Sequence, residues 1–333
     1  MLRTLASALT LLTVLASACS AQTGPKTKTL QELSQELAAL PASNDPMWLA
    51  QSGEIVRDAS LAEIKEALPS LVRLSESEDG PQSRNALFVI YGIASRQKAG
   101  LPENQRENDI AAAQLVVPYI PRLAPRLFDP DMLRRSVSLM TFQSLAAVRP
   151  APPELIAAAI QVLQDPRSTI QLPDAATRSP ARKAPSMGPL MLWVLLPAGA
   201  TFYRDPVTGI TERQDSPDVQ QAILTFLRRP DQTAESRTES IRAMALAQPQ
   251  NTAVNAELLR WLDSSDTSVQ VSLLRNLPRL TLSPADFAWG NARVKQLSED
   301  PAAPNDVRML ATALLGCWNN DRHRNPECML LHP

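Results

Sequence analysis

The stretch from Asn251 to Leu280 constrains the fold most, because it contains two helical patterns joined by a short polar connector. Asp266, in the connector, is a good N-cap because its carboxylate can accept hydrogen bonds from unpaired backbone N–H groups. Neither helix can bury its apolar face alone, so the pair requires neighbours of the same kind. The apolar residues, spaced to lie on one face of a helix, are Val254, Leu258, Trp261 and Leu262, then Val269, Leu273, Leu277 and Leu280.

The composition agrees with a helical protein. The sequence has only 10 glycines but 29 prolines among its 333 residues. Sheet-rich folds need glycine in turns, and phosphate-binding loops need it for close backbone approach. Helices punctuated by proline are therefore favoured. The formal net charge of −1 gives no support for nucleic-acid binding, which requires a basic surface.

Similar pairs of helical patterns recur from Ser60 to Trp318 at intervals of roughly 35 to 55 residues, the range of helical-pair repeats. Ser60 and Glu63 form a capping-box pattern where the repeats begin. One partner helix is displaced by an insertion, and we expect it in the apolar segment 188–199. The succession predicts an all-α fold, an α-solenoid of about six antiparallel helical pairs with one inserted loop and β-hairpin.

The pairs share further features. Several carry Pro in the first helix (Pro69, Pro118), Asp in the turn (Asp129, Asp263, Asp300) and Arg early in the second helix, best seen in Asp306-Val307-Arg308. In this succession the chain resembles HEAT repeats. Arg84, Arg134 or Arg135, and Arg237 lie at or near the same Arg position, whereas Gln270 departs from it. The resemblance implies that these Asp and Arg residues form buried or inter-repeat hydrogen bonds along the stack, not a functional site. The signature and fixed period of TPR repeats are absent.

The N-terminus has the pattern of an export signal. Arg3 is followed by an apolar run too short to span a bilayer, and Ala16-Ser17-Ala18 precedes Cys19. This arrangement resembles the lipobox of bacterial lipoproteins and makes Cys19 a candidate for lipidation, although Ala16 stands where that family usually has Leu. Ordinary cleavage, before Cys19 or after Ala21, is the alternative. We expect an exported protein, either periplasmic or a membrane-anchored lipoprotein.

Cys317 and Cys328 are the only other cysteines. In an oxidising compartment an even, local pair indicates a disulfide. His323 and His332 lie nearby, but the spacing matches no zinc pattern, so we expect neither a metal nor a cofactor. The predicted organisation is a signal peptide (1–18), a tether (19–28), an N-terminal helical cap (29–59), repeats (60–165), an insertion (166–215), further repeats (216–318) and a disulfide-closed tail (319–333).

The insertion supplies the candidate contact surface. It contains an apolar run that fits a buried helix, from Met187 to Ala200, and then a predicted β-hairpin with Pro206 and Gly209 in its turn. Solenoid insertions emerge as loops on one face, often the binding face. An alternative is a mobile loop and a hairpin that fills a gap in the stack. The candidate contact residues are Arg178, Arg182, Lys183, Tyr203, Arg204 and Arg213.

The sequence contains no nucleophile elbow, P-loop, dinucleotide fingerprint or zinc-protease motif. Helical repeats without such motifs predict a non-catalytic scaffold or adaptor of the cell envelope that binds a protein or peptide on an extended surface. One alternative is an envelope enzyme or glycan-processing accessory that uses the insertion as its active loop. Another is a structural protein without a specific ligand.

Overall fold

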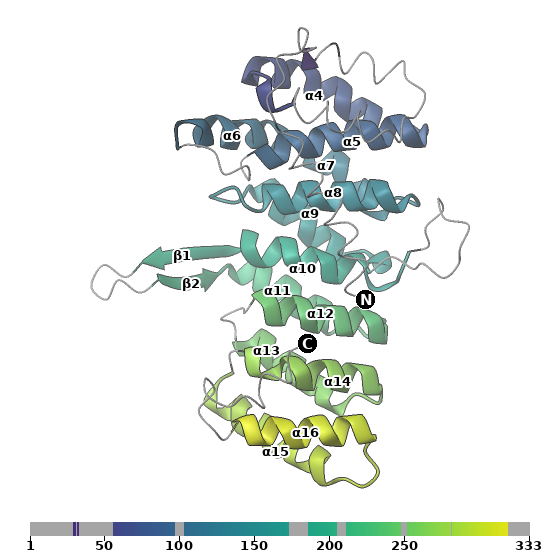
Figure 1. Ribbon diagram of the computed structural model, residues 1–333, viewed down its shortest axis with the longest axis vertical. Helices are drawn as coiled ribbons and strands as arrows, with labels where there is room; N and C mark the ends of the chain where they lie inside the picture. The colour runs from purple at the N-terminus through teal and green to yellow at the C-terminus, as the bar shows by residue number, and fades with distance from the viewer. Residues whose placement is uncertain are drawn as a thin grey trace, which may run out of the picture. The chain divides into compact units, whose positions relative to one another are not determined.

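The computed structural model describes residues 29–30, 32, 56–96, 103–172, 186–204, 211–247, 252–280 and 282–318 (Figure 1). The chain divides into two compact units. Unit 1 comprises residues 1–126 and 136–145, and unit 2 comprises residues 127–135 and 146–333. The helix α8 (Met132–Leu145) and the 3-10 helix η3 (Ala124–Phe128) contribute residues to both. Most of the predicted N-terminal helical cap lies outside the described residues.

Unit 1 is built on a pair of helices, α4 (Leu61–Ser75) and α5 (Gly80–Ser95), followed by α6 (Glu103–Val116), η2 (Val117–Tyr119) and α7 (Ile120–Leu123). The capping box predicted at the start of α4 is confirmed. The backbone N–H of Ser60 donates to Glu63 Oε2 at 2.7 Å, and the N–H of Glu63 donates to Ser60 Oγ at 3.3 Å. The apolar side chains between α4 and α5 form a buried core, which includes Leu68, Leu71, Ile90 and Ile93.

Unit 2 consists of helical pairs arranged in two layers. The first layer contains α9 (Pro153–Gln164), α11 (Pro217–Leu227), α13 (Thr252–Leu259) and α15 (Pro284–Glu299). The second contains α10 (Met187–Ala198), α12 (Ala234–Ala247), α14 (Thr267–Asn276) and α16 (Asn305–Trp318). Within each layer every helix packs against the next helix of that layer (Figure 1). Short 3-10 helices follow α9, α13 and α14: η4 (Pro166–Thr169), η5 (Arg260–Asp263) and η6 (Leu277–Arg279). This packing confirms the predicted all-α solenoid.

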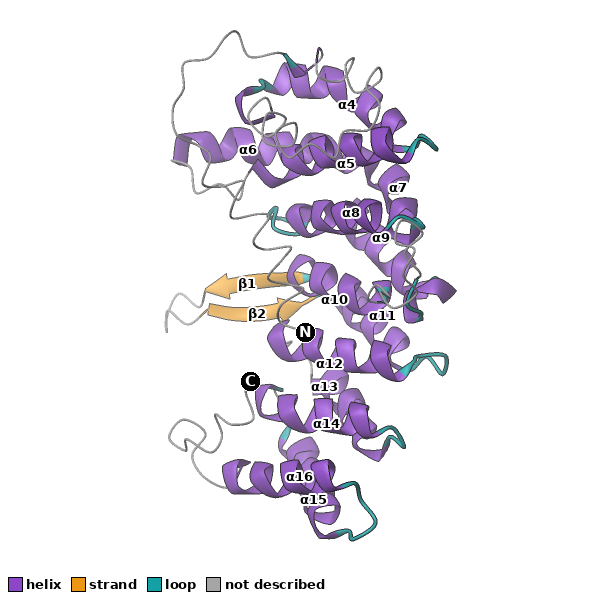
Figure 2. Cartoon of the chain, turned by 45° about the vertical axis from the view of Figure 1, so that its right-hand side comes forward, coloured by secondary structure: helices purple, strands orange, loops and turns teal. Residues whose placement is uncertain are grey.

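The predicted β-hairpin is also confirmed. Strands β1 (Ala200–Arg204) and β2 (Thr211–Asp215) pair in antiparallel fashion, with Ala200 opposite Asp215 (Figure 2). The backbone N–H of Ser216 donates to the carbonyl of Gly199 at 2.7 Å, which closes the base of the ribbon. The predicted turn residues, Pro206 and Gly209, lie outside the described residues.

Helix α10 occupies the position of the displaced partner helix, because it packs against both α9 and α12. Its side chains are mostly buried, as its uniformly apolar sequence requires. Gly188, in its first turn, lies so close to α11 that a Cβ atom would stand 2.5 Å from the ring of Phe226. The start of α10 therefore packs directly on Phe226.

One hydrogen bond recurs in four of the pairs. A side chain from the second helix, or from the turn before it, donates to a carbonyl at the end of the first helix, where helical partners are lacking. Gln270, which departs from the Arg pattern, makes this bond to Leu262 O at 2.9 Å with its amide. The other three bonds join Ser83 to Ser75 O, Arg135 to Asp129 O and Gln232 to Phe226 O.

The turn aspartates have structural roles. Asp129 pairs with Arg134 at 3.0 Å, and both side chains are largely buried. Asp263, on η5, pairs with Arg293 of α15 at 2.6 Å and so joins neighbouring repeats. Asp266 caps α14 as predicted, accepting the N–H of Ser268 at 2.8 Å.

Candidate functional site

A groove of about 520 Å³ lies between α9 and α11. Residues three and four apart on a helix share a face, and the α11 part of the lining is one such stripe. It runs from the first turn of α11 to just beyond the last, a length of about 16 Å. The lining comprises Ile160, Leu163 and Gln164 from α9, and Asp218, Gln221, Ala222, Thr225, Phe226 and Arg229 from α11 and the turn after it.

The floor of the groove is apolar and its rim is polar. Leu163 and Phe226 are buried. Gln164, Gln221 and Thr225 are exposed, and the amide of Gln221 donates to Thr225 Oγ1 at 3.3 Å. These neutral amide and hydroxyl groups can donate and accept hydrogen bonds. The groove can therefore accommodate apolar side chains below and bond a backbone at the rim.

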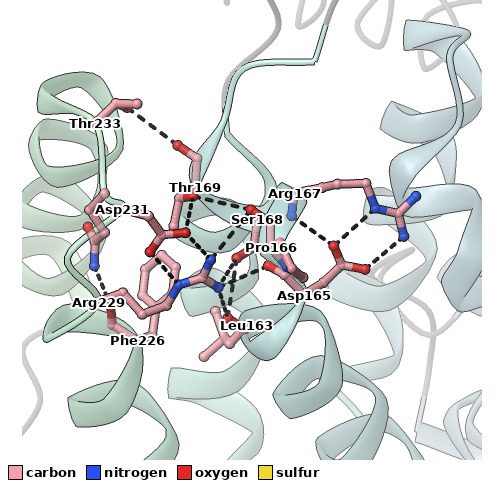
Figure 3. Close-up of polar contacts among 11 residues, drawn as sticks. Leu163, Asp165, Pro166, Arg167, Ser168, Thr169, Phe226, Arg229, Asp231 and Thr233 are labelled. Carbon is pink, nitrogen blue, oxygen red and sulfur yellow. Dashed lines mark hydrogen bonds and ion pairs between the residues drawn. The ribbon is translucent and has the colours of Figure 1, made fainter.

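Arg229 lies at one end of the lining of the groove, and Figure 3 shows its polar contacts. Its Nη1 donates to the carbonyls of Leu163 at 2.8 Å and Asp165 at 2.9 Å, and to Ser168 Oγ at 2.9 Å. Leu163 O and Asp165 O lie at the C-terminal end of α9, where carbonyls lack helical partners. Arg229 thus ties the end of α11 to the end of α9.

The same guanidinium forms a two-point ion pair with Asp231. Nε donates to Asp231 Oδ1 at 2.9 Å and Nη2 to Oδ2 at 2.5 Å. Thr169 Oγ1 lies 3.2 Å from the same carboxylate. The hydrogen bonds from Arg229 lower the pKa of Asp231 to about 2. The positive charge of Arg229 is therefore neutralised within the protein.

Asp218 stands at the opposite end of the groove, in the first turn of α11. Its side chain is exposed. Because Asp231 neutralises the charge of Arg229, the carboxylate of Asp218 is, among the described residues, the unpaired charge of the lining. The groove therefore offers a ligand a negative charge.

The predicted contact residues are divided between described and undescribed parts of the chain. Arg178, Arg182 and Lys183 lie outside the described residues. Tyr203, Arg204 and Arg213 belong to the hairpin, with position 203 opposite 212 and position 202 opposite 213. Since alternate positions of a strand point to opposite faces, positions 204 and 213 share one face of the ribbon and position 203 lies on the other.

The cysteine predictions stay predictions. Cys19 and Cys328 lie outside the described residues, and Cys317 is described only as part of the backbone of α16. Within the described part of the chain, no three His, Cys, Asp or Glu side chains are grouped as metal ligands would be. No helix in that part is long and apolar enough to cross a bilayer.

The sequence does not predict the groove between α9 and α11. The stripe on α11 is visible as a helical pattern, but its polar members resemble an ordinary solvated face. That this face borders a hollow depends on how α11 packs against α9. The sequence contains a weak signal in Arg229-Pro230-Asp231, an ion pair across a turn.

No family model matches the sequence, and no curated protein matches it. Among solved structures, a designed armadillo repeat protein in complex with the peptide (KR)4 is 16% identical, with a TM-score of 0.32; the match covers 88% of this chain and 100% of that one. The complex of CpcE and CpcF of phycocyanin lyase from Nostoc sp. PCC7120 is 17% identical, with a TM-score of 0.36, over 95% and 96% of the two chains. The assignment to helical pairs rests on the packing of the described helices.

Proposed function

We propose that this protein is a non-catalytic scaffold or adaptor of the cell envelope that binds a protein partner through an extended peptide segment. The groove between α9 and α11 is its docking site. The observation that carries the proposal is the continuous stripe on α11, which lines a hollow with an apolar floor and a rim of hydrogen-bonding side chains.

The dimensions of the groove favour an extended peptide. The stripe is about 16 Å long, and an extended chain rises about 3.3 Å per residue. Some five residues of a partner would span it. Their backbone can bond to Gln164, Gln221 and Thr225 while alternate side chains reach the apolar floor.

The charge of the groove specifies the peptide further. Asp218 is exposed at one end, and Arg229 at the other end is already paired with Asp231. A carboxylate at the rim favours a basic side chain on the partner and mainly affects specificity and the association rate. The bound segment is therefore apolar, with a lysine or arginine at the end that meets Asp218.

The test is selection of random seven-residue peptides displayed on phage against the full-length protein, with three variants in parallel. Thr225→Trp fills the groove from its exposed rim. Asp218→Lys reverses the charge at one end. Gln161→Trp is the matched control, because Gln161 is exposed on α9 but does not line the groove.

We expect wild type and Gln161→Trp to enrich the same basic, apolar peptides. Thr225→Trp should weaken their binding at least about tenfold, which corresponds to a free-energy loss of about 1.4 kcal/mol, and Asp218→Lys should remove the preference for basic residues. Peptides that bind Thr225→Trp as well as wild type would place the site elsewhere. A reproducible catalytic activity, lost when a residue of the insertion is changed, would defeat the scaffold proposal.

The envelope location rests on the N-terminal sequence pattern alone. Mass spectrometry of the mature N-terminus tests it. A lipid-modified Cys19 is the expected terminus of an anchored protein, whereas an unmodified Gln22 terminus excludes the lipid and leaves simple export. An intact Met1 in protein from the native cell would contradict both.

A further inference from the structure

The junction between α10 and α12 contains a buried polar contact that the groove does not use. The carboxylate of Glu239, on α12, accepts the backbone N–H of Ser186 at 3.2 Å. Ser186 is the N-cap residue of α10, but its side chain makes no capping hydrogen bond. Its hydroxyl oxygen is buried and has no hydrogen-bond partner among the residues that the structure describes. A carboxyl group and an unpaired buried hydroxyl therefore occupy the same junction.

Glu239 is poorly compensated as an anion. Burial has the largest effect on the pKa of Glu239 and raises it from the ordinary value of 4.5 to about 7. The hydrogen bond from the Ser186 backbone N–H is the next largest influence and lowers the pKa. Glu235, one turn earlier on α12, raises it, and Arg242 lowers it. Helix α10, which packs on α12, has no titratable residue between Met187 and Ala198. Among the described residues, Glu235 and Arg242 are the charged groups that act on Glu239.

The neutral carboxyl suits this junction better than the carboxylate. An ionised carboxylate only accepts hydrogen bonds, whereas a protonated one also has an O–H to donate. That O–H offers a donor to the buried oxygen of Ser186, because the same carboxyl group already accepts the backbone N–H of this residue. Protonation also removes the cost of keeping a charge partly desolvated without an ion pair.

We propose that Glu239 and Ser186 form a proton-controlled latch that holds the start of α10 on α12. The latch is closed when Glu239 carries a proton and is weakened when the proton is lost. Because the first turn of α10 packs directly on Phe226, which lines the groove, the latch also controls how firmly the groove floor is supported. That last consequence rests on the proposed function, whereas the latch itself does not.

The direction of the pH dependence follows from the raised pKa. In the opened junction Glu239 titrates near its ordinary 4.5, and in the closed junction near 7. Between these values the closed state binds more protons than the open one, so its stability falls as pH rises. The loss is complete once the pH has passed the higher pKa.

Hydrogen–deuterium exchange of the full-length protein at pH 6 and pH 8 tests the latch, with exchange times corrected for the intrinsic effect of pH. The readout is the protection of the first two turns of α10, and α14 serves as an internal reference. In wild type we expect α10 protection to fall about tenfold from pH 6 to pH 8. The reference helix should not change.

Two variants test whether Glu239 causes the pH dependence of α10 protection. Glu239→Gln is neutral at both values of pH, so α10 should stay protected at pH 8. Glu235→Gln, one turn away and exposed, should retain most of the pH dependence. A pH dependence that persists in Glu239→Gln overturns the proposal, and so does a wild-type α10 whose protection is the same at both values. The second outcome requires no variant to fold. Neither outcome depends on whether the groove binds a peptide.

Discussion

At the scale of single residues, Arg229 is the most heavily bonded side chain near the groove. It contacts backbone carbonyls at the end of α9, a hydroxyl and a carboxylate, and its side chain is only 15% exposed. A rigid guanidinium with five N–H donors can serve several acceptors at once, which an ammonium group cannot. The residue therefore fastens two neighbouring repeats.

Arg229→Ala should lower the free energy of unfolding by about 1 to 3 kcal/mol, because it removes a donor from the partly buried carbonyls of Leu163 and Asp165. Arg229→Lys should lose less, since it keeps the charge but reaches fewer acceptors. Equilibrium unfolding in urea measures both. Equal losses in the two variants would mean that the charge contributes nothing and only the fork geometry matters.

The pair of Arg229 and Asp231 predicts a response to acid. The pKa of Asp231 in the folded protein is about 2, below its ordinary 3.8. A depressed folded pKa contributes stability that is present above the ordinary value and is lost as pH falls through the folded one. Asp231→Asn should therefore flatten the decline of stability between pH 4 and pH 2. Wild type and variant declining in parallel in acid unfolding curves would refute this.

At the scale of elements, local sequence signals specify where each helix forms, but they do not specify which helices pack beside it. The capping box of Ser60 and the cap of Asp266 are readable in the sequence and are present in the structure. Helix α10 is different. Its apolar length indicates burial, whereas its close approach to Phe226 at Gly188 follows only from the packing of α10 on α11.

Substitution by alanine should have opposite effects on stability at Gly188 and at Gly316. Helix propensity alone favours alanine over glycine by about 1 kcal/mol. At Gly188 a new Cβ would stand 2.5 Å from the Phe226 ring and 2.8 Å from Ser168 O. At this position overpacking should outweigh the gain in helix propensity and lower the free energy of unfolding by about 1 to 3 kcal/mol.

At Gly316, in α16, no described residue outside the backbone of its own helix lies within 4 Å of the corresponding Cβ position. Gly316→Ala should therefore stabilise by up to about 1 kcal/mol. Thermal unfolding of the two variants beside wild type is the measurement. A Gly188→Ala protein as stable as wild type would show that α10 can shift away from α11 without cost.

At the scale of the whole molecule, the layers of unit 2 make stability a nearest-neighbour property. Helices α10, α12, α14 and α16 each pack on the next in the layer. In such an array the stability is approximately the sum of the repeat and interface contributions. Damage to one helix should therefore spread to its neighbours and weaken with distance.

Leu273→Ala tests this. Leu273 lies in α14 and its side chain is fully buried. The cavity should cost about 2 to 5 kcal/mol. Hydrogen exchange should quicken most in α14, then in α12 and α16, and least in α10, which packs on α12 rather than on α14. A uniform increase throughout the chain would indicate a single cooperative unit instead.

The sequence by itself determined the class of fold, because periodic apolar residues, caps and proline positions act locally. It also indicated the hairpin, and the resemblance to HEAT repeats implied the structural role of turn residues such as Asp129. It could not determine that Gln270 replaces an arginine in bonding to Leu262 O, since that depends on the distance between two helix ends.

The groove was decided only by the tertiary structure. Asp218, Gln221 and Thr225 have the appearance of a solvated face in the sequence, and only the packing of α11 beside α9 gives that face an apolar floor. The pKa of Glu239 has the same origin, because burial under α10 raises it and no local pattern records that burial. Local spacing fixes which residues share a face, but burial and charge pairing arise between segments distant in sequence.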